Sequence, residues 1–467
     1  MSVPGVRAAA RVAASQGESL VDFAASLSVR HLPPRVLKQA ADCLLDSLGC
    51  GLFGAKQPWG EMMAANTIAE SAAGASSLFG RRERVAPAPA ALVNGTAIHG
   101  YELDDLIVGA VVHPGAVVVP AALAAAEHVD APGIRLLLGV VAGYETMSRV
   151  ALALGPEPSQ RGFHVTAVVG PVAAAVAAGV AMGLDREQLL AAVGLACSAS
   201  SGIKSFAGGS GGGMVKRMHA GRSAEAGVRM CQLAVRGYTG PRAALDGKFG
   251  LLEVFGGKGA DASRLTGGLG ERWAIDDIWV KVYPMCGGIH SAAQGLRQLR
   301  GDRSLAPADI EAVHVGVSAF AARNNAERDP QDTMGAQYSI PYCAAVALLA
   351  DPLDPAMFAE SALQAPALRS VAAKVSVHVD EEAESLYPRK LAARVELRLK
   401  GGEARSVSIV EAHGTPADPC TEGERRDRFA RLASAAVPAV SIGAMMRAAA
   451  ELAGASSVRG LMHPLRG

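Results

Sequence analysis

Residues 94–126 read NGTAIHGYELDDLIVGAVVHPGAVVVPAALAAA, a stretch that begins with ionisable side chains and ends as an uncharged apolar helix. A helix over Ala97–Leu106 would place His99 and Glu102 on one face, three residues apart, with Asp104 and Asp105 near its C-terminal end. Carboxylates there face the negative end of the helix dipole. We therefore expect a group from outside this helix to stabilise them.

Within this stretch, His113-Pro114-Gly115 interrupts regular secondary structure between the polar and the apolar part. Proline restrains the residue before it away from the helical region, and glycine tolerates unusual backbone angles. His113 is thus predicted in a loop beside two acids. The stretch is either part of a polar active site or a set of solvated acids that cap an ordinary turn.

The composition favours a mostly helical protein without a polyanionic partner. Of 467 residues, half are hydrophobic and only 4% are aromatic, so Ala, Val and Leu must build the core. The net charge is +1 and no block of like charge occurs, which argues against binding to nucleic acid or to an anionic membrane. A small-molecule partner is expected.

The cysteines and the hydrophobic segments indicate a cytoplasmic protein. Seven scattered cysteines never form a CxxC pair, which favours reduced thiols and argues against a zinc knuckle or an iron–sulfur site. Residues 1–17 have no long apolar core, so no secretory signal is expected. Thr166–Leu184 is long enough to span a membrane, but its Ala, Gly and Val content and Pro171 favour a buried helix.

Hydrophobic periodicity predicts helices through the first half of the chain. Glycines at 49, 51 and 54 are expected to end the helix Pro34–Phe53, and a polar loop is expected at 76–88. None of the helices follows the glycine fingerprint of a dinucleotide domain, so no nicotinamide or flavin site is expected. These helices are Ser19–Leu27, Pro34–Phe53, Ile134–Leu154, Thr166–Leu184 and Arg186–Ala196.

Two further polar motifs precede helices in this half. In Arg161-Gly162-Phe163-His164, a histidine at a helix N-terminus can bind an anion, or it can be a structural cap. Residues 207–221 read AGGSGGGMVKRMHAG, in which the glycines, Gly212 among them, can present backbone N–H groups to a carboxylate or phosphate. Lys216 and His219 follow on one helix face. The alternative is a flexible surface loop. The motif is not a Walker A loop, because it lacks the Gly-Lys-Ser/Thr ending.

After about residue 270 the pattern changes to a smaller α+β domain. Strands are predicted at Val313–Val317, Val375–Val379, Ala392–Leu399 and Ser406–Ala412, with a hairpin turn at 400–403 and helices at Gly288–Leu299 and Ser339–Leu349. We predict a helical domain over 1–272, an α+β domain over 273–420, and a helical return over 421–467. Lys281 and His290 bracket a Pro/Gly loop at the domain junction, where ligand clefts tend to form.

Several blocks, taken in order, resemble the signature motifs of the MmgE/PrpD family. They are Asn94-Gly95…His99…Glu102-Leu-Asp104-Asp105…His113-Pro114-Gly115, Arg161-Gly-Phe-His164, Lys216-Arg-Met-His219-Ala-Gly221 and Lys281-Val-Tyr-Pro284…His290. That family includes 2-methylcitrate dehydratase, cis-aconitate decarboxylase and iminodisuccinate epimerase. The resemblance covers nearly the whole chain. It implies a mainly α fold with a large all-helical domain and a smaller α+β lid domain, a homodimer, and no metal or organic cofactor.

The resemblance to the cis-aconitate decarboxylase members implies His113, His164, Lys216 and Lys281 as active-site groups. Those members have an aspartate in place of Glu102, a threonine in place of Leu106, and a tyrosine near the position of Ala322. These departures argue against decarboxylation. They leave the shared chemistry, in which a proton moves at a carbon next to a carboxylate.

The residue types suit that chemistry. Lysines and a glycine loop can hold carboxylates and neutralise an enolate, a neutral histidine can move the proton, and Asp104 or Asp105 can orient the imidazole. The expected function is a 2-methylcitrate dehydratase-like hydro-lyase; the alternatives are a dicarboxylate epimerase, a cis-aconitate-type decarboxylase and a non-catalytic carboxylate-binding protein. The expected catalytic residues are His113, His164, Lys216, Lys281 and Asp104. The residues expected to bind substrate, or to support those that do, are Glu102, Asp105, Gly212, His219 and His290.

Overall fold

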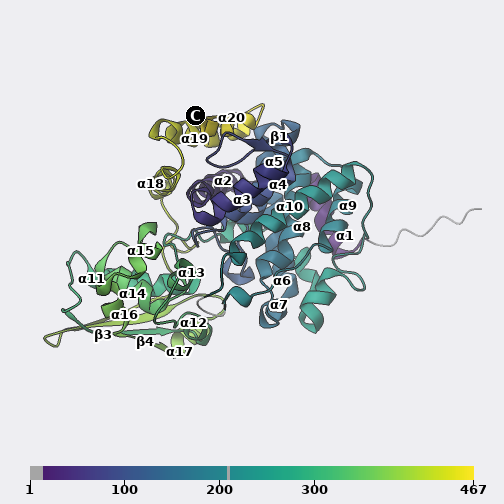
Figure 1. Cartoon of the computed structure of the whole chain (residues 1–467). Coiled ribbons are helices and arrows are strands. Elements are labelled where there is room, and N and C mark those ends of the chain that lie inside the picture. Colours follow the sequence, from purple (N-terminus) through teal and green to yellow (C-terminus); the bar gives the residue numbers. More distant parts are fainter. Residues whose placement is uncertain (1–13, 208–210, 467) are drawn as a thin grey trace, which may run out of the picture.

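The computed structural model describes residues 14–207 and 211–466, which fold into a helical lobe and a sheet lobe (Figure 1). Most of the segment 1–17, in which no secretory signal is expected, lies outside the described residues, as do 208–210 of the predicted glycine loop. The helices of the helical lobe, up to the chain's passage into the sheet lobe, are α1 (Gln16–Ser26), α2 (Pro34–Ala55), α3 (Pro58–Glu70), α4 (Pro87–Ile98), α5 (Gly115–Val129), α6 (Gly133–Leu154), α7 (Glu157–Gln160), α8 (Val165–Met182), α9 (Arg186–Cys197) and α10 (Val215–Val235).

The apolar helix α8 lies at the centre of this lobe and is packed by α5, α6, α9 and α10. Small residues allow the close approach: a Cβ on Gly143 of α6 would lie 2.6 Å from Val118 and 2.8 Å from Ala177. Within the described residues, two helices, α6 and α8, are long and apolar enough to cross a membrane, but 94% of each apolar window is buried inside the protein. This burial agrees with the prediction of a core helix at Thr166–Leu184.

Three local predictions in this lobe are wrong: the glycines expected to end α2, the polar loop at 76–88 and the helix at Ala97–Leu106. Helix α2 continues through Gly51 and Gly54 to Ala55, because these glycines permit close packing: a Cβ on Gly54 would lie 1.9 Å from the Ala97 carbonyl oxygen. The predicted polar loop at 76–88 contains parts of a two-stranded antiparallel sheet, β1 (Ala73–Ser77) and β2 (Arg84–Val85). Helix α3 was not predicted.

The third error concerns the polar stretch itself, because α4 ends at Ile98 and no helix spans Ala97–Leu106. Glu102 adopts a left-handed backbone with φ of 56°, which is incompatible with a continuing helix. The backbone of Leu106 instead pairs with that of Trp279 at 3.0 Å and 2.9 Å. The carboxylates therefore lie on a buried turn that is held by contacts from distant segments.

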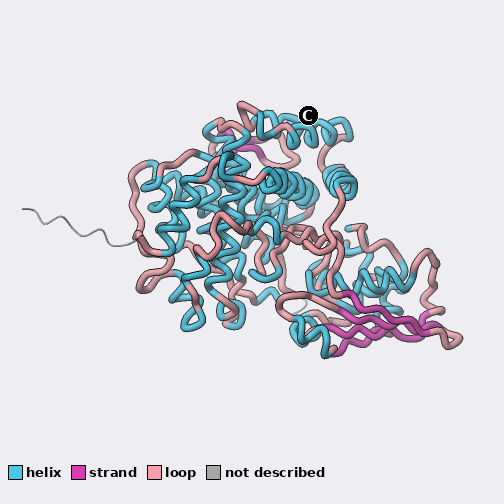
Figure 2. The backbone as a smooth tube through the Cα atoms, turned by 180° about the vertical axis from the view of Figure 1, so that it is seen from behind, coloured by secondary structure: helices cyan, strands magenta, loops and turns pink. Residues whose placement is uncertain are grey.

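The sheet lobe contains a four-stranded mixed sheet with the order β4-β3-β5-β6, in which β3 pairs parallel with β4 and antiparallel with β5. Figure 2 shows the strands at one end of the molecule, away from the helical lobe. The four predicted strands are confirmed, with shifts of one to three residues at some ends: β3 (Ile310–Val317), β4 (Val375–Val379), β5 (Ala393–Leu399) and β6 (Ala404–Ile409). The hairpin turn lies between β5 and β6, where Gly401 and Gly402 have positive φ.

Seven helices belong to this lobe in the described residues, and two of them match the predicted ones. Alternate residues of β5 are buried beneath them. The helices are α11 (His290–Arg300), α12 (Ala319–Asn324), α13 (Thr333–Gln337), α14 (Ile340–Leu349), α15 (Glu360–Leu363), α16 (Pro366–Ala372) and α17 (Glu381–Leu386).

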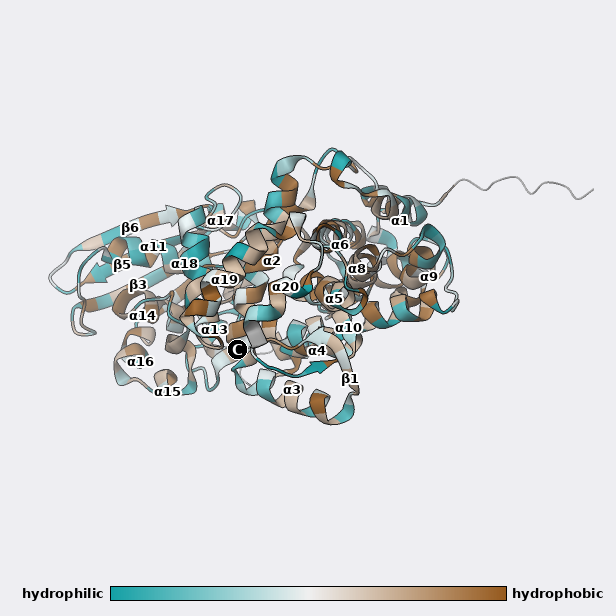
Figure 3. Ribbon diagram, turned by 90° about the horizontal axis from the view of Figure 1, so that it is seen from above, coloured by the Kyte–Doolittle hydropathy of each residue, from teal (hydrophilic) through white to brown (hydrophobic). Residues whose placement is uncertain are grey.

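The chain then returns to the helical lobe through α18 (Glu422–Ala433), α19 (Ala439–Ala450) and α20 (Arg459–Met462). Figure 3 shows α18 and α19 beside α2. The guanidinium of Arg428 in α18 contacts Asp46 of α2 at 2.7 Å. The mainly α fold is confirmed; the boundaries at 272/273 and 420/421 stay predictions.

Candidate active site

Two buried lysines from different segments converge on one carboxylate, that of Glu102. Lys281 Nζ lies 3.0 Å from Glu102 Oε2, and Lys216 of α10 pairs with Oε1 of the same side chain. The Tyr338 hydroxyl donates to Oε1 at 3.4 Å. Burial and the nearby Lys281 hold the pKa of Lys216 well below its usual value. The left-handed turn at Glu102 thus places an acid between two lysines that have little access to water.

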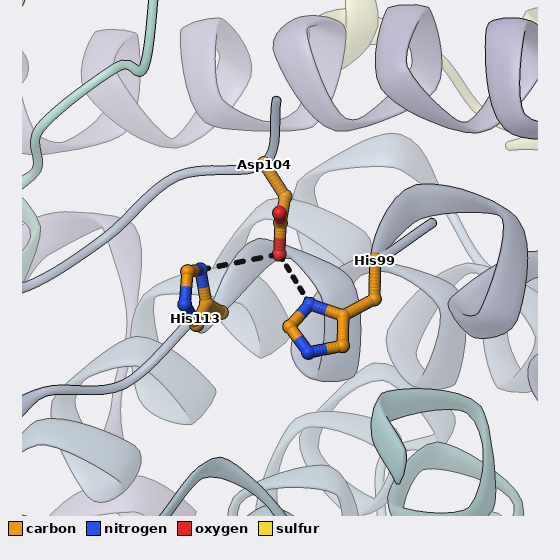
Figure 4. A group of neighbouring side chains, drawn as sticks. All are labelled: His99, Asp104 and His113. Atoms are coloured by element: carbon orange, nitrogen blue, oxygen red, sulfur yellow. Dashed lines mark hydrogen bonds and ion pairs between the residues drawn. The ribbon is translucent and has the colours of Figure 1, made fainter. Parts of the chain in front are cut away.

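Asp104 joins two histidines beside this pair (Figure 4). Its Oδ2 lies 2.6 Å from His99 Nδ1 and 3.3 Å from His113 Nδ1, and Lys281 Nζ lies 3.7 Å from Oδ1. Burial raises the pKa of Asp104, but His113, His99 and Lys281 together outweigh burial and hold it well below the usual value. Asp104 therefore stays ionised and can stabilise a charged imidazole.

His113 is held so that one ring nitrogen is free. Its Nδ1 also lies 2.8 Å from the backbone oxygen of Asp105, and a carbonyl can only accept. In the neutral imidazole the proton is therefore on Nδ1, and Nε2 keeps its lone pair. This is the tautomer that a general base needs.

His164 and His219 extend the histidine cluster. His164 is the N-cap residue of α8, as predicted for a histidine at a helix N-terminus, and its Nδ1 lies 3.1 Å from Nδ1 of His219. Its ring stacks on His99, with centroids 5.6 Å apart, and the rings of His99 and His113 are 5.0 Å apart. Burial lowers the pKa of His99 to about 3 and lowers that of His164 well below its usual value. His99 and His164 are thus held as neutral imidazoles.

The other predicted residues lie at the edge of this cluster. The Asp105 carboxylate accepts from Tyr144 Oη at 2.6 Å and from the first amide of α5, Gly115, at 2.8 Å, and burial raises its pKa to about 7. Asp105 thus anchors α5. It makes no ion pair with a lysine in residues 14–207 and 211–466.

His290 and Gly212 contact the backbone around the site, and Lys281 lies close enough to His290 to add to the effect of burial on its pKa. His290 Nε2 donates to the Met285 carbonyl at 3.2 Å, and its ring packs between Trp279 and Tyr283. Burial lowers its pKa to about 3. A Cβ on Gly212 would lie 2.4 Å from the Phe206 carbonyl oxygen, so no larger residue fits there without a shift of the backbone. These positions support the fold around the site.

The sequence patterns missed several residues that hold the site. Tyr338 follows α13, and its ring lies 5.5 Å from Lys216 Nζ. Arg217 donates to the Gly100 carbonyl at 2.9 Å, and Arg428 donates to the Leu103 carbonyl at 2.6 Å. Arg217 lies inside the Lys216-Arg-Met-His219 motif, so the sequence could have indicated it. No local sequence pattern marks Tyr338 or Arg428.

The side chains of His99, Asp104 and His113 are close enough together to ligate one metal ion, because a donor atom of each lies within 4.8 Å of the others. Asp104 is already paired with the ammonium of Lys281 at 3.7 Å, however, and this positive charge would repel a cation bound to the same carboxylate. The donors also hydrogen-bond to each other and to backbone. The arrangement suits proton transfer better than cation binding.

The fold and the cluster together define a two-lobed, mainly α-helical protein with a buried lysine–histidine–carboxylate site. Residues 18–263 match the MmgE/PrpD N-terminal domain, and residues 283–450 match the MmgE/PrpD C-terminal domain. The chain therefore belongs to the MmgE/PrpD family.

Curated relatives span most of the chain. Cis-aconitate decarboxylase of Aspergillus terreus is 29% identical over 84% of each chain. The cis-aconitate decarboxylase-like protein oryM of Aspergillus oryzae is 30% identical over 90% of each chain. Cis-aconitate decarboxylase of Homo sapiens is 26% identical over 89% of this chain and 87% of its own. The family and these relatives agree with a lyase-type enzyme.

Proposed function

We propose that this chain is a lyase that removes the proton next to a carboxylate of a small di- or tricarboxylate and then eliminates water, with 2-methylcitrate as the first substrate to test. The observation that carries the proposal is the convergence of Lys216 and Lys281 on one buried carboxylate beside four contiguous imidazoles. Metal-free proton transfer requires these two parts: cations for developing negative charge and a neutral base.

The two lysines would bind the substrate carboxylate next to the reacting carbon. When the C–H bond breaks, its electron pair spreads onto the carboxylate oxygens, and the ammonium groups stabilise that charge. Low water access strengthens this interaction relative to bulk solvent. Tyr338, whose hydroxyl already lies near Glu102, is placed to donate a further hydrogen bond.

A histidine would take the proton. His113 Nε2 or His164 accepts it, and Asp104 stabilises the imidazolium that forms at His113. The electron pair then forms a C=C bond while the β-hydroxyl leaves with a proton from a second acid, which yields water. Reprotonation of the same carbanion from the opposite face would instead give an epimer.

A second candidate, cis-aconitate decarboxylation, is favoured by the names of the relatives. In that reaction a C–C bond breaks and CO₂ leaves, the electron pair of that bond forms a new C=C bond while the old double bond shifts, and a histidine donates a proton to the far carbon of the old double bond. Three positions argue against it: Glu102, Leu106 and Ala322 differ from the decarboxylase pattern. Tyr338 supplies a tyrosine to the site from another position.

Proton NMR in D₂O with 2-methylcitrate, citrate, cis-aconitate and iminodisuccinate tests the proposal in one assay. We expect a new vinyl or methyl signal of the dehydrated acid from 2-methylcitrate. Itaconate from cis-aconitate would favour the second candidate, and deuterium exchange with inversion would favour an epimerase. Thermal stabilisation by these acids without turnover or exchange would make the chain a carboxylate-binding protein.

Two variants test which residues bind the substrate carboxylate and which residue removes the proton. Lys216→Ala is expected to fold and to abolish turnover, with the exposed Lys38→Ala as its control. His164→Gln is expected to stop exchange of the substrate α-proton, with the exposed His128→Gln as its control. Undiminished exchange in His164→Gln removes His164 as the base, and wild-type turnover in Lys216→Ala removes that lysine from the chemistry.

A further inference from the structure

A third lysine, Lys204, lies on the same face of a short backbone pairing as His164. Residues 202–204 run antiparallel to 162–164: the His164 amide donates to the Gly202 carbonyl at 2.9 Å, and the Lys204 amide donates to Gly162 at 2.7 Å. Phe163 and Ile203 form the bridge between them. Because side chains alternate across paired extended segments, Lys204 and His164 point to the face opposite Phe163 and Ile203.

The residue opposite His164 in this pairing is Gly202, where a Cβ would lie only 2.5 Å from the Ala167 side chain. A Cβ at Gly202, whose φ is 105°, would lie 3.6 Å from the His219 ring. The His219 ring therefore lies against the face of the pairing that carries Lys204 and His164. Lys204 is therefore placed at the histidine end of the site, whereas Lys216 and Lys281 lie at the Glu102 end.

Lys204 is partly buried and lacks an acidic partner in residues 14–207 and 211–466. Its Nζ reaches the Ser159 hydroxyl at 3.3 Å and lies 5.5 Å from the ring centre of Phe320. Ser159 belongs to the helical lobe and Phe320 to α12 of the sheet lobe. A cation at this junction, unpaired by any carboxylate of the described residues, suits an anionic ligand that enters between the lobes.

The charges of the central cluster are already matched, since Lys216 and Lys281 face Glu102 and Asp104. With one substrate carboxylate bound at these lysines, a di- or tricarboxylate would still bring further negative charge that has no cation there. Lys204 supplies the additional cation, and it does so away from the two lysines. The charge pattern thus fits an acid whose carboxylates are separated along its carbon chain.

We propose that Lys204 binds a second carboxylate of the substrate, remote from the one held by Lys216 and Lys281. This inference rests on the proposed function and narrows its substrate class to acids with separated carboxylates. Lys204 is then a specificity-determining residue: its loss weakens binding of the second carboxylate and leaves the reacting end in place.

Isothermal titration with non-reacting acids tests this directly. Glutarate and its monoamide have the same carbon chain but differ by one carboxylate, and propane-1,2,3-tricarboxylate adds a third. We expect Lys204→Gln to raise the Kd of glutarate and of the tricarboxylate about 10-fold, the effect of losing one charge-assisted contact, and to leave the monoamide's Kd unchanged. Lys204→Arg should restore most of the affinity because it keeps the charge.

Lys248→Gln is the matched control, since Lys248 also lies on an aromatic ring, that of Phe249, but is exposed. Equal changes for the diacid and its monoamide, or no change for either diacid, would overturn the proposal for Lys204, as would failure of the wild-type protein to bind the diacids. Binding that depends on Lys204 without turnover of any acid would instead overturn only the proposed reaction.

Discussion

Helix α8 and the turn at 99–106 are buried to a similar degree but by different physical means. The residues from Val165 to Ala181 are apolar or small, apart from Thr166, and they are stabilised by close contact with neighbouring helices. The turn buries His99, Glu102, Asp104 and Asp105, whose desolvation must be offset by specific partners. One region is buried at low cost and supplies stability, whereas the other is buried at high cost and supplies charged groups for chemistry.

The largest expected effect comes from Lys281→Met, which removes one of the two cations at the turn. Loss of one group that stabilises developing negative charge is expected to lower kcat/KM by about 10²–10³-fold, or roughly 3–4 kcal/mol. Glu102 keeps Lys216 and Asp104 keeps both histidines, but the buried cluster loses one positive charge, so the thermal midpoint should also fall. Steady-state kinetics and thermal unfolding measure the two effects; wild-type kcat/KM would contradict the assignment.

The next effect is a pH-dependent difference in stability between Asp105→Asn and the wild type. The folded pKa of Asp105, about 7, lies above its ordinary value of 3.8, so its stabilising contribution is complete below that ordinary value and is lost as pH rises through 7. Asparagine does not titrate. The free energy of unfolding of the wild type minus that of the variant should fall by about 2 kcal/mol from about pH 5.5 to about pH 8.5.

Urea unfolding at several pH values, followed by circular dichroism, measures this difference. Parallel pH profiles for Asp105→Asn and the wild type would show that Asp105 ionises normally in the folded protein. A substitution within α8 should show no such pH dependence of stability, because no side chain of that helix titrates in this range.

The smallest effect is expected in the apolar region, from Gly227→Ala on α10. Its Cβ would lie 2.4 Å from both the Ala174 side chain and the Ala175 amide nitrogen, so the helices must separate. Overpacking costs about 1–3 kcal/mol and the gain in helix propensity returns about 1, which leaves a net loss of about 1 kcal/mol. The thermal midpoint should fall while kcat/KM of the folded protein is unchanged.

Gly460→Ala is the matched control for Gly227→Ala, because Gly460 also lies in a helix but a Cβ there would meet nothing within 4 Å. An equal fall in midpoint for both variants would contradict the packing explanation. A fall in kcat/KM for Gly227→Ala would show that α10 transmits strain to Lys216, and the contrast between the two regions would then be weaker.

The sequence predicts the regular elements well where a single periodicity decides them. The strand Val375–Val379 matches β4 at both ends, and Arg186–Ala196 matches α9 to within one residue. The strand β1 was missed because its sequence, AGASS, has no β-branched or aromatic residue. The helix at Ala97–Leu106 was wrong because tertiary contacts at Gly100 and Leu106 decide that backbone, and local spacing cannot reveal them.

The candidate site follows the same rule. His113, His164, Lys216 and Lys281 stand in recognisable motifs and can be selected from sequence. Lys204, Tyr338 and Arg428 have no pattern around them, and only the folded chain brings them to the site. The homodimer, the cytoplasmic location and the roles of the site residues stay predictions.

The hydrogen bond from Arg428 to the Leu103 carbonyl gives the C-terminal return a consequence beyond packing. This guanidinium bonds to the backbone between Glu102 and Asp104 and spans 325 residues of sequence to do so. A chain cut before α18 would keep each lysine and histidine named above, yet the backbone between its two acids would lose this donor. Truncation near the end of the coding sequence is therefore expected to disturb the site, although its lysines and histidines are all encoded upstream.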